Sequence, residues 1–248
     1  MAFETERSAW TRGQADVAQI DVGLRQYMLR VYNYMASGLA LTGLTAALVA
    51  NTPALWDLFF QVGPVGRAAP TMLGWIAIIA PIGLVLALSF GIAKMRASTA
   101  QGLFWLYAGL MGISLSSIFM VYTGTSITRV FFITAASFTG LSLYGYTTKR
   151  NLSAFGSFLI MGLWGLIIAS VVNIFLHSSA LQFVMSVAGV LIFAGLTAWD
   201  TQKIKEMYFE GDGSEIAGKK SVMGALTLYL DFINLFILLL RFFGDRRQ

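Results

Sequence analysis

The apolar residues of the chain are gathered into seven long runs, which short polar segments separate. Each run holds about 20 residues with few charges, the length at which an α-helix crosses the hydrocarbon core of a bilayer. The connections "TGTS" and "HSSA" are so short that they predict two tight helical hairpins. The predicted membrane-spanning helices are Met28–Val49, Met72–Ala93, Gly102–Tyr122, Ile127–Tyr146, Ala154–Leu176, Leu181–Thr201 and Val222–Phe243.

This pattern divides the chain into three parts. Residues 1–27 precede the first run, and Val17, Ile20, Leu24 and Met28 recur there at helical spacing. The spacing predicts a short amphipathic surface helix on the cytoplasmic side, with a partner-binding arm as the alternative. Residues 28–243 form the membrane domain, and residues 244–248 form a C-terminal tail. The predicted fold class is therefore an all-α polytopic membrane protein.

Composition agrees with a membrane protein and removes several chemistries. Hydrophobic residues make up 57% of the chain and charged residues 12%, about half of the charged share in soluble domains. The mean hydropathy is +0.71. No cysteine is present, which excludes disulfides and thiolate chemistry. The single histidine, His177, is predicted in a loop, where it has no second histidine or cysteine with which to share a metal.

The basic residues are distributed unequally between the two sides of the predicted membrane domain. Of the 17 Lys and Arg residues, twelve fall on the side of the N-terminus and five on the other side. The positive-inside rule therefore predicts a cytoplasmic N-terminus and an external C-terminus. The net charge of +5 accompanies no nucleic-acid-binding motif, so we expect no nucleic acid partner.

Only two of the twelve acidic residues lie within the apolar runs, namely Asp200 and Asp231. Their predicted helices are consecutive and antiparallel, and the two residues lie about 5 Å and 13 Å from the cytoplasmic ends. Each belongs to a stripe of small and polar residues, a feature that faces other helices or a water-filled cavity. The stripes are Ser186, Gly189, Phe193, Thr197 and Asp200, and Ser221, Gly224, Thr227, Asp231 and Asn234.

Two adjacent carboxyl groups tend to share one proton, because they cannot both ionise cheaply. When ionised, they offer the hard oxygen ligands that calcium prefers. Asp200 and Asp231 are therefore predicted to form a pH-sensing, cation-gating site that binds calcium weakly, with waters and carbonyls completing the coordination. Two other interpretations remain open. Asp200 could be an interfacial cap, and Asp231 could make a buried structural hydrogen bond.

Three segments carry a family resemblance: "NIFL", "FAGLTAWDTQKI" and "LYLDFINLFILLLRFF", in that order. They resemble the Bax inhibitor, or transmembrane Bax-inhibitor-motif, family in its bacterial form. The resemblance implies six helices around a central seventh, a pH-sensitive calcium leak, and a location in the bacterial inner (plasma) membrane. It also implies that Asp200 and Asp231 pair at the cytoplasmic side of the pore.

Members of that family have an arginine after the second span that engages the acid pair in the closed form. Arg96 is the best match by position, and Lys94 is its rival. Arg96 could equally be a basic anchor that orients the protein. The resemblance alone does not decide between these two roles.

Other functions would use the same features differently. A proton-coupled cation transporter would use the acid pair for exchange, and a non-conducting regulator would bind another membrane protein. An intramembrane aspartyl protease is disfavoured, because "AWDTQ" and "YLDFI" lack the Tyr-Asp and Gly-x-Gly-Asp signatures. We therefore expect no enzymatic activity and no cofactor. The expected partners are calcium ions, protons and membrane lipids.

Overall fold

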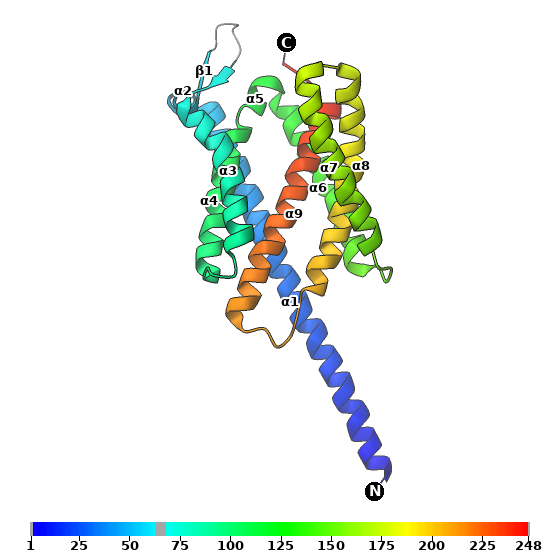
Figure 1. Cartoon of the computed structure of the whole chain (residues 1–248). Helices are drawn as coiled ribbons and strands as arrows, with labels where there is room; N and C mark the ends of the chain where they lie inside the picture. The colour runs from blue at the N-terminus through cyan, green and yellow to red at the C-terminus, as the bar shows by residue number, and fades with distance from the viewer. Residues whose placement is uncertain (1, 63–67, 248) are drawn as a thin grey trace.

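The computed structural model describes residues 2–62 and 68–247, with side chains described for residues 22–61 and 69–247. Seven helical spans in this part of the chain are long and apolar enough to cross a membrane, which confirms the predicted all-α polytopic fold (Figure 1). They are α1 (Ala2–Asn51), α3 (Met72–Gly91), α4 (Ala97–Leu115) continued by α5 (Ile118–Val121), α6 (Gly124–Thr147), α7 (Ser153–Leu176), α8 (Ser179–Glu206) and α9 (Ser214–Phe243).

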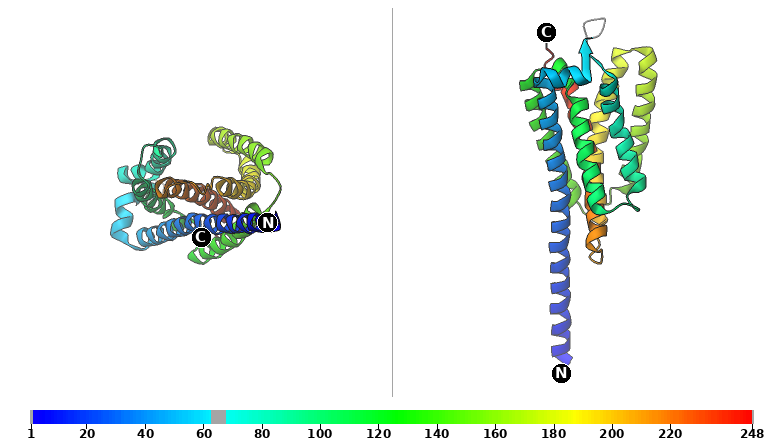
Figure 2. Two further views of the ribbon diagram at one scale, coloured as in Figure 1. Left: turned by 90° about the horizontal axis from the view of Figure 1, so that it is seen from below. Right: turned by 90° about the vertical axis from the view of Figure 1, so that its left-hand side faces the viewer.

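The first helix is longer than its apolar run. The segment predicted to form a surface helix running into the first span is the first part of α1, a single helix of 50 residues that projects beyond the bundle (Figure 2). No proline interrupts the sequence between the two parts, so the helix continues. The side chains of Val17 and Ile20 lie outside the described residues. Leu24 is half-buried and Met28 is buried.

Helices α8 and α9 also extend past the predicted boundaries. Helix α8 continues to Glu206 rather than ending at Thr201, and α9 begins at Ser214 rather than Val222. The added turns contain lysine, glutamate and alanine, which favour helix without being part of an apolar run. Apolar runs therefore locate the membrane-crossing portion of a helix and underestimate its full length.

A small structure outside the spans joins α1 to α3. It consists of α2 (Pro53–Phe59) and an antiparallel pair of strands, β1 (Phe60–Val62) and β2 (Ala68–Pro70). Strands of three residues are too short for a period-two pattern to emerge from the sequence. For that reason the hairpin was not predicted.

Helix α9 occupies the centre of the bundle, as the resemblance implies (Figure 2). In its most apolar stretch 67% of residues are buried inside the protein, against at most 28% in any other span. Helices α1, α4, α6 and α8 pack directly on α9, while α3 and α7 lie outside and pack on α4 and α8. The six helices around the seventh thus form an inner group of four and an outer pair.

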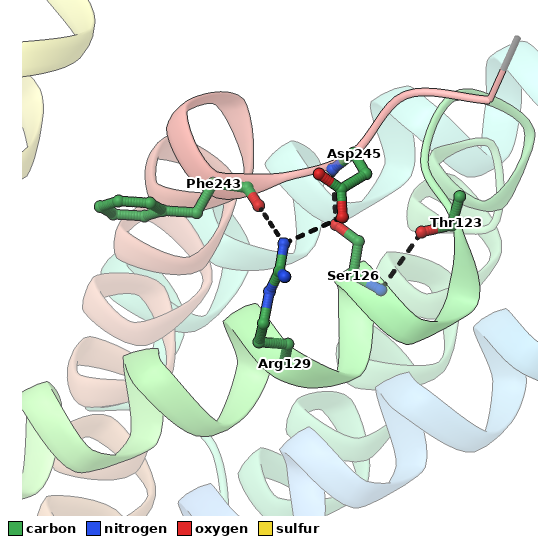
Figure 3. Close-up of polar contacts among 5 residues, drawn as sticks. All are labelled: Thr123, Ser126, Arg129, Phe243 and Asp245. Atoms are coloured by element: carbon green, nitrogen blue, oxygen red, sulfur yellow. Dashed lines mark hydrogen bonds and ion pairs between the residues drawn. The ribbon is translucent and has the colours of Figure 1, made fainter.

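The C-terminal tail fastens the end of α9 to the start of α6 (Figure 3). Arg129 donates hydrogen bonds to the carbonyl oxygen of Phe243 at 2.9 Å and to Asp245 Oδ2 at 3.0 Å. The backbone N–H of Asp245 donates to Ser126 Oγ at 2.8 Å, and the N–H of Thr123 donates to the Asp245 carbonyl at 3.0 Å. This end of the central helix is therefore held by four hydrogen bonds to one neighbour.

Helices α6 and α8 are in close backbone contact at Gly145. A Cβ atom at this position would overlap the carbonyl group of Ala198, two residues before Asp200. Only glycine fits without a shift of one helix away from the other.

We therefore predict that Gly145→Ala lowers the thermal unfolding midpoint of the purified protein, with a loss of about 1–3 kcal/mol typical of overpacking. Gly140→Ala is the matched control on the same helix, because no atom lies within 4 Å of the added Cβ. That change should be neutral or slightly stabilising. Equal midpoints for the two variants would contradict the close contact.

Candidate functional site

The structure brings Asp200 of α8 and Asp231 of α9 together inside the membrane domain. Their exposed fractions are 8% and 5%, and their carboxyl groups lie within hydrogen-bonding distance of each other. A hydrogen bond between two carboxyl groups requires a proton on one of them. The geometry is therefore suited to a pair that shares one proton.

Glycines on both sides of the pair allow α8 and α9 to approach. A Cβ atom on Gly224 would lie 3.0 Å from Ile204 Cγ2, and one on Gly189 would lie 2.9 Å from Leu238 Cδ1. Gly224 precedes Asp231 by two helical turns, and Leu238 follows it by two turns. The two helices are therefore in close contact on either side of the carboxyl groups.

The other polar residues of the two stripes bond to their own helices. Thr197 donates to the carbonyl oxygen of Phe193 at 2.8 Å, Thr227 donates to that of Met223 at 3.1 Å, and Asn234 donates to that of Leu230 at 2.8 Å. These side-chain donors are therefore bonded to carbonyl groups one turn earlier on their own helices, a bond that serine and threonine often make within membrane helices.

One acceptor of the pair is unsatisfied. Among the described residues Asp231 Oδ2 is buried and has no hydrogen-bond partner. Leaving a buried polar group unpaired costs about 1–3 kcal/mol. This oxygen is therefore a place where a proton, a water molecule or a cation would be bound favourably.

Within the described residues, neither aspartate forms an ion pair. The two ion pairs found there are Arg129–Asp245 and Lys220–Asp212. The basic side chain whose charge acts on Asp200 is Lys203, one turn further along α8. Its ammonium group is exposed and lies 5.0 Å from the centroid of the Trp199 ring. The spacing of three residues on one helix could have identified Lys203 from the sequence.

Arg96 lies far from the acid pair. It is exposed and occupies the N-cap position of α4, where the next N–H, that of Ala97, donates to Glu215 Oε1 at 2.6 Å. Glu215 precedes Asp231 on α9 by 16 residues, which is about 24 Å along the helix. The contact between Arg96 and the pair is therefore not formed in this conformation. Lys94 is also exposed, in the connection just before it.

No group of three or more His, Cys, Asp or Glu side chains that could hold a metal ion occurs among the residues that the structure describes. The pair supplies at most four carboxylate oxygens, and calcium takes six to eight. Waters or carbonyl groups would have to complete the coordination of any calcium held there. Such a site is weak and exchangeable.

A chain of hydroxyl groups near the pair was not predicted. Tyr32 OH of α1 lies 2.7 Å from Ser142 Oγ of α6, which lies 2.9 Å from Thr201 Oγ1 of α8. Thr201 donates its own proton to the Thr197 carbonyl, so the donors run from Tyr32 through Ser142 to Thr201. This chain links three helices beside Asp200. Its members are too distant in sequence for any local pattern to reveal them.

Comparisons with known proteins extend over nearly the whole chain. A family model described as "Inhibitor of apoptosis-promoting Bax1" matches residues 24–248. An uncharacterized protein of Rickettsia prowazekii is 52% identical over 228 residues, which cover 92% of this chain and 93% of the relative. The inner membrane protein YbhL of Escherichia coli K12 is 47% identical over 235 residues, with coverage of 93% and 96%.

The shared proton makes a prediction about stability. The folded pair binds a proton that two water-exposed aspartates would release, so the free energy of unfolding should fall as pH rises, by up to about 1.4 kcal/mol per pH unit for one proton. In Asp231→Asn the amide donates to the Asp200 carboxylate without a bound proton, and this slope should disappear. Thermal unfolding from mildly acidic to mildly alkaline pH measures the effect.

Asp245→Asn is the control for that experiment, because it removes an exposed carboxylate at the opposite end of α9. Its slope should match that of the unmodified protein. A slope in Asp231→Asn equal to that of the control would mean that the pair holds no proton in the folded state.

Proposed function

The chain belongs to the Bax inhibitor family, and from this premise we propose that it is a pH-sensitive calcium-leak channel gated by Asp200 and Asp231. The observation that carries the proposal is the buried approach of the two carboxyl groups to within hydrogen-bonding distance, at a point where no ion pair with a described residue neutralises them. Ionisable groups inside a membrane domain are expensive and are usually functional.

The proposed gate depends on the charge of the pair. With one shared proton the pair carries a single negative charge and a hydrogen bond holds α8 against α9. Loss of that proton leaves two negative charges in contact, which repel by about 4 kcal/mol at 4 Å and an effective dielectric of 20. The repulsion separates the two carboxylates, and their negative charge attracts a cation. Asp231 Oδ2, which has no hydrogen-bond partner among the described residues, can then act as one of its ligands.

Calcium and protons compete for the same oxygens in this mechanism. A hard divalent cation that binds two carboxylates and several waters exchanges quickly, because the site is incomplete. Weak binding suits permeation, since an ion must leave the site as readily as it enters.

We further propose that the protein resides in a bacterial inner membrane with its N-terminus in the cytoplasm. The chain is an integral membrane protein, and its relative YbhL is an inner membrane protein. The orientation rests on the excess of basic residues on the side of the N-terminus. The acid pair then responds mainly to the cytoplasmic pH.

Proton-coupled cation exchange is the second candidate, because a carboxyl pair with one shared proton is also the arrangement that exchange requires. A channel passes calcium down its gradient at any ratio to protons, whereas an exchanger moves the two in a fixed ratio. A non-conducting regulator would show neither flux.

Flux into proteoliposomes that contain only this protein tests the proposal. We expect calcium to enter down its gradient faster than sodium or potassium, with a steep dependence on pH. In Asp231→Asn only Asp200 remains to titrate, so the steep dependence should be lost. A calcium-sensitive dye inside the vesicles reports the rate.

The control for this assay is Asp245→Asn, which should keep the pH profile of the unmodified protein. Absence of calcium flux in folded, reconstituted protein would favour the regulator. A fixed calcium-to-proton ratio would favour the exchanger. An unchanged pH profile in Asp231→Asn would exclude this residue as the sensor.

A second prediction separates Arg96 from Lys203. Because Arg96 adjoins the contact to Glu215, which precedes Asp231 by about 24 Å along α9, the effects of Arg96→Ala and Asp231→Asn on the pH midpoint of flux should add within about 0.3–0.5 kcal/mol. Lys203→Ala should combine with Asp231→Asn non-additively, because its charge acts on the pair directly. A double-mutant cycle for each basic residue measures both.

Non-additivity for Arg96 would instead mean that α3 and α4 move in another conformation and bring it to the acids as a lock. Arg96→Lys and Lys94→Ala then assign the contact, since lysine lacks the planar fork that binds carboxylates bidentately.

A further inference from the structure

Helices α1 and α6 both pack on α9 but hardly on each other, and a groove runs between them. It consists of two sections with volumes of about 650 and 470 Å³, and both sections are lined by Leu39, Ala40, Phe131 and Phe232. These values lie within the range of about 300–1,000 Å³ typical of ligand sites. Because the sections share walls and floor, we treat them as one site, the α1–α6 groove.

The groove follows α1 through the thickness of the membrane domain. Its lining on α1 extends from Arg25 to Ala46, a span of 21 residues or about 32 Å. The hydrocarbon core of a bilayer is about 30 Å thick. Almost all of the lining is aliphatic or aromatic, so water would not fill the groove stably, and lipid hydrocarbon is the medium in contact with it.

One end of the groove carries a positive charge. Arg25 lines this end, is exposed, and forms no ion pair with any residue that the structure describes. Tyr146 lines the same section from α6, and the exposed side chains of Lys149 and Arg150 follow it closely in sequence. The remaining length offers few polar atoms. This distribution, a basic end on a long apolar channel, is complementary to an anionic phospholipid.

We propose that the α1–α6 groove binds an anionic phospholipid, with one acyl chain between the helices and the phosphate at Arg25. A guanidinium group binds phosphate oxygens bidentately. The site should therefore prefer a lipid with a net negative headgroup whose phosphate Arg25 can reach. An acyl chain is flexible enough to follow the irregular lining.

A transmembrane helix of another protein fits the groove less well. Helices in membranes approach over small residues on both sides. Helix α1 offers Ala36 and Ala40 and α6 offers Ala135, but α6 also presents Phe131 and Phe138. Their rings pack on Phe232 with centroids 5.5 and 5.6 Å apart, and so occupy the space that a helix backbone would need.

The bound chain would lie beside the acid pair. Phe232, on the floor of the groove, is the residue after Asp231 on α9, and Tyr32 and Ser142 of the hydroxyl chain also line the groove. The lipid therefore contacts the same helices that carry the carboxyl groups. The lipid site depends only on the shape and charge of the groove, and not on whether the protein conducts calcium.

Photolabelling of the full-length protein in phosphatidylcholine vesicles tests the site. The probe is a trace of phosphatidylglycerol with a diazirine near the end of one acyl chain, compared with a chain-matched phosphatidylcholine probe. We expect the phosphatidylglycerol probe to label α1 and α6 several-fold more than the phosphatidylcholine probe does, and an excess of unlabelled phosphatidylglycerol to displace it.

Variants then locate the chain and the headgroup. Ala135→Phe and Ala40→Phe fill the groove from opposite walls and should remove the displaceable labelling, whereas Ala136→Phe, which changes an exposed neighbour outside the groove, should not. Arg25→Gln should abolish the headgroup preference, and Arg30→Gln, an exposed arginine outside the groove, should retain it.

Labelling spread evenly over α3 and α7, or equal in Ala135→Phe and Ala136→Phe, would overturn the proposal. So would a preference for phosphatidylglycerol that survives Arg25→Gln. A photoreactive side chain at Ala40 that links to a protein in native membranes, and not to lipid, would replace the lipid with a partner helix. Two groove-filling variants on different helices keep the test valid if one does not fold.

Discussion

The packing of α8 against α9 brings the carboxyl groups of Asp200 and Asp231 into contact within the protein interior. Two carboxyl groups so close together favour one shared proton, because two negative charges there would repel each other. The close approaches at Gly189 and Gly224 keep the two helices near each other on both sides of the pair. In the proposed gate, protonation and helix position are therefore linked, because a second charge would push the two helices apart.

Contacts with neighbouring elements hold α9 at its two ends. At the end near the C-terminus, Arg129 and Ser126 hold the tail and the last turn of the helix against α6 (Figure 3). Toward its other end α9 leaves the core of the bundle and joins α8 through a loop (Figure 1). The groove between α1 and α6 borders the same helix. The loop end of α9 is held as well, because Lys220 pairs with Asp212 and Glu215 accepts a hydrogen bond from the N–H of Ala97. The carboxyl pair therefore lies between two fastened ends of the central helix.

The sequence predicted the number and order of the spans because apolar runs of about 20 residues are specific to membrane helices. It also singled out Asp200 and Asp231, since intramembrane carboxylates are rare. The other features of the site depend on how distant segments pack in three dimensions, which the sequence pattern does not show. The distance between Arg96 and the pair depends on how α4 meets the start of α9, through Glu215, and no local pattern encodes that contact. The hydroxyl chain from Tyr32 to Thr201 and the gap between α1 and α6 likewise arise only when distant segments assemble.

The position of α9 has a consequence for biosynthesis. The helix that forms the core follows the six other spans in chain order, so those spans are translated before the surface they pack on exists. Domains generally assemble as their segments emerge from the ribosome, but here the inner faces of α1, α4, α6 and α8 must wait for α9. A nascent chain that stops short of α9 would leave these faces open to lipid, and the cell's quality-control proteases could recognise it as unfinished.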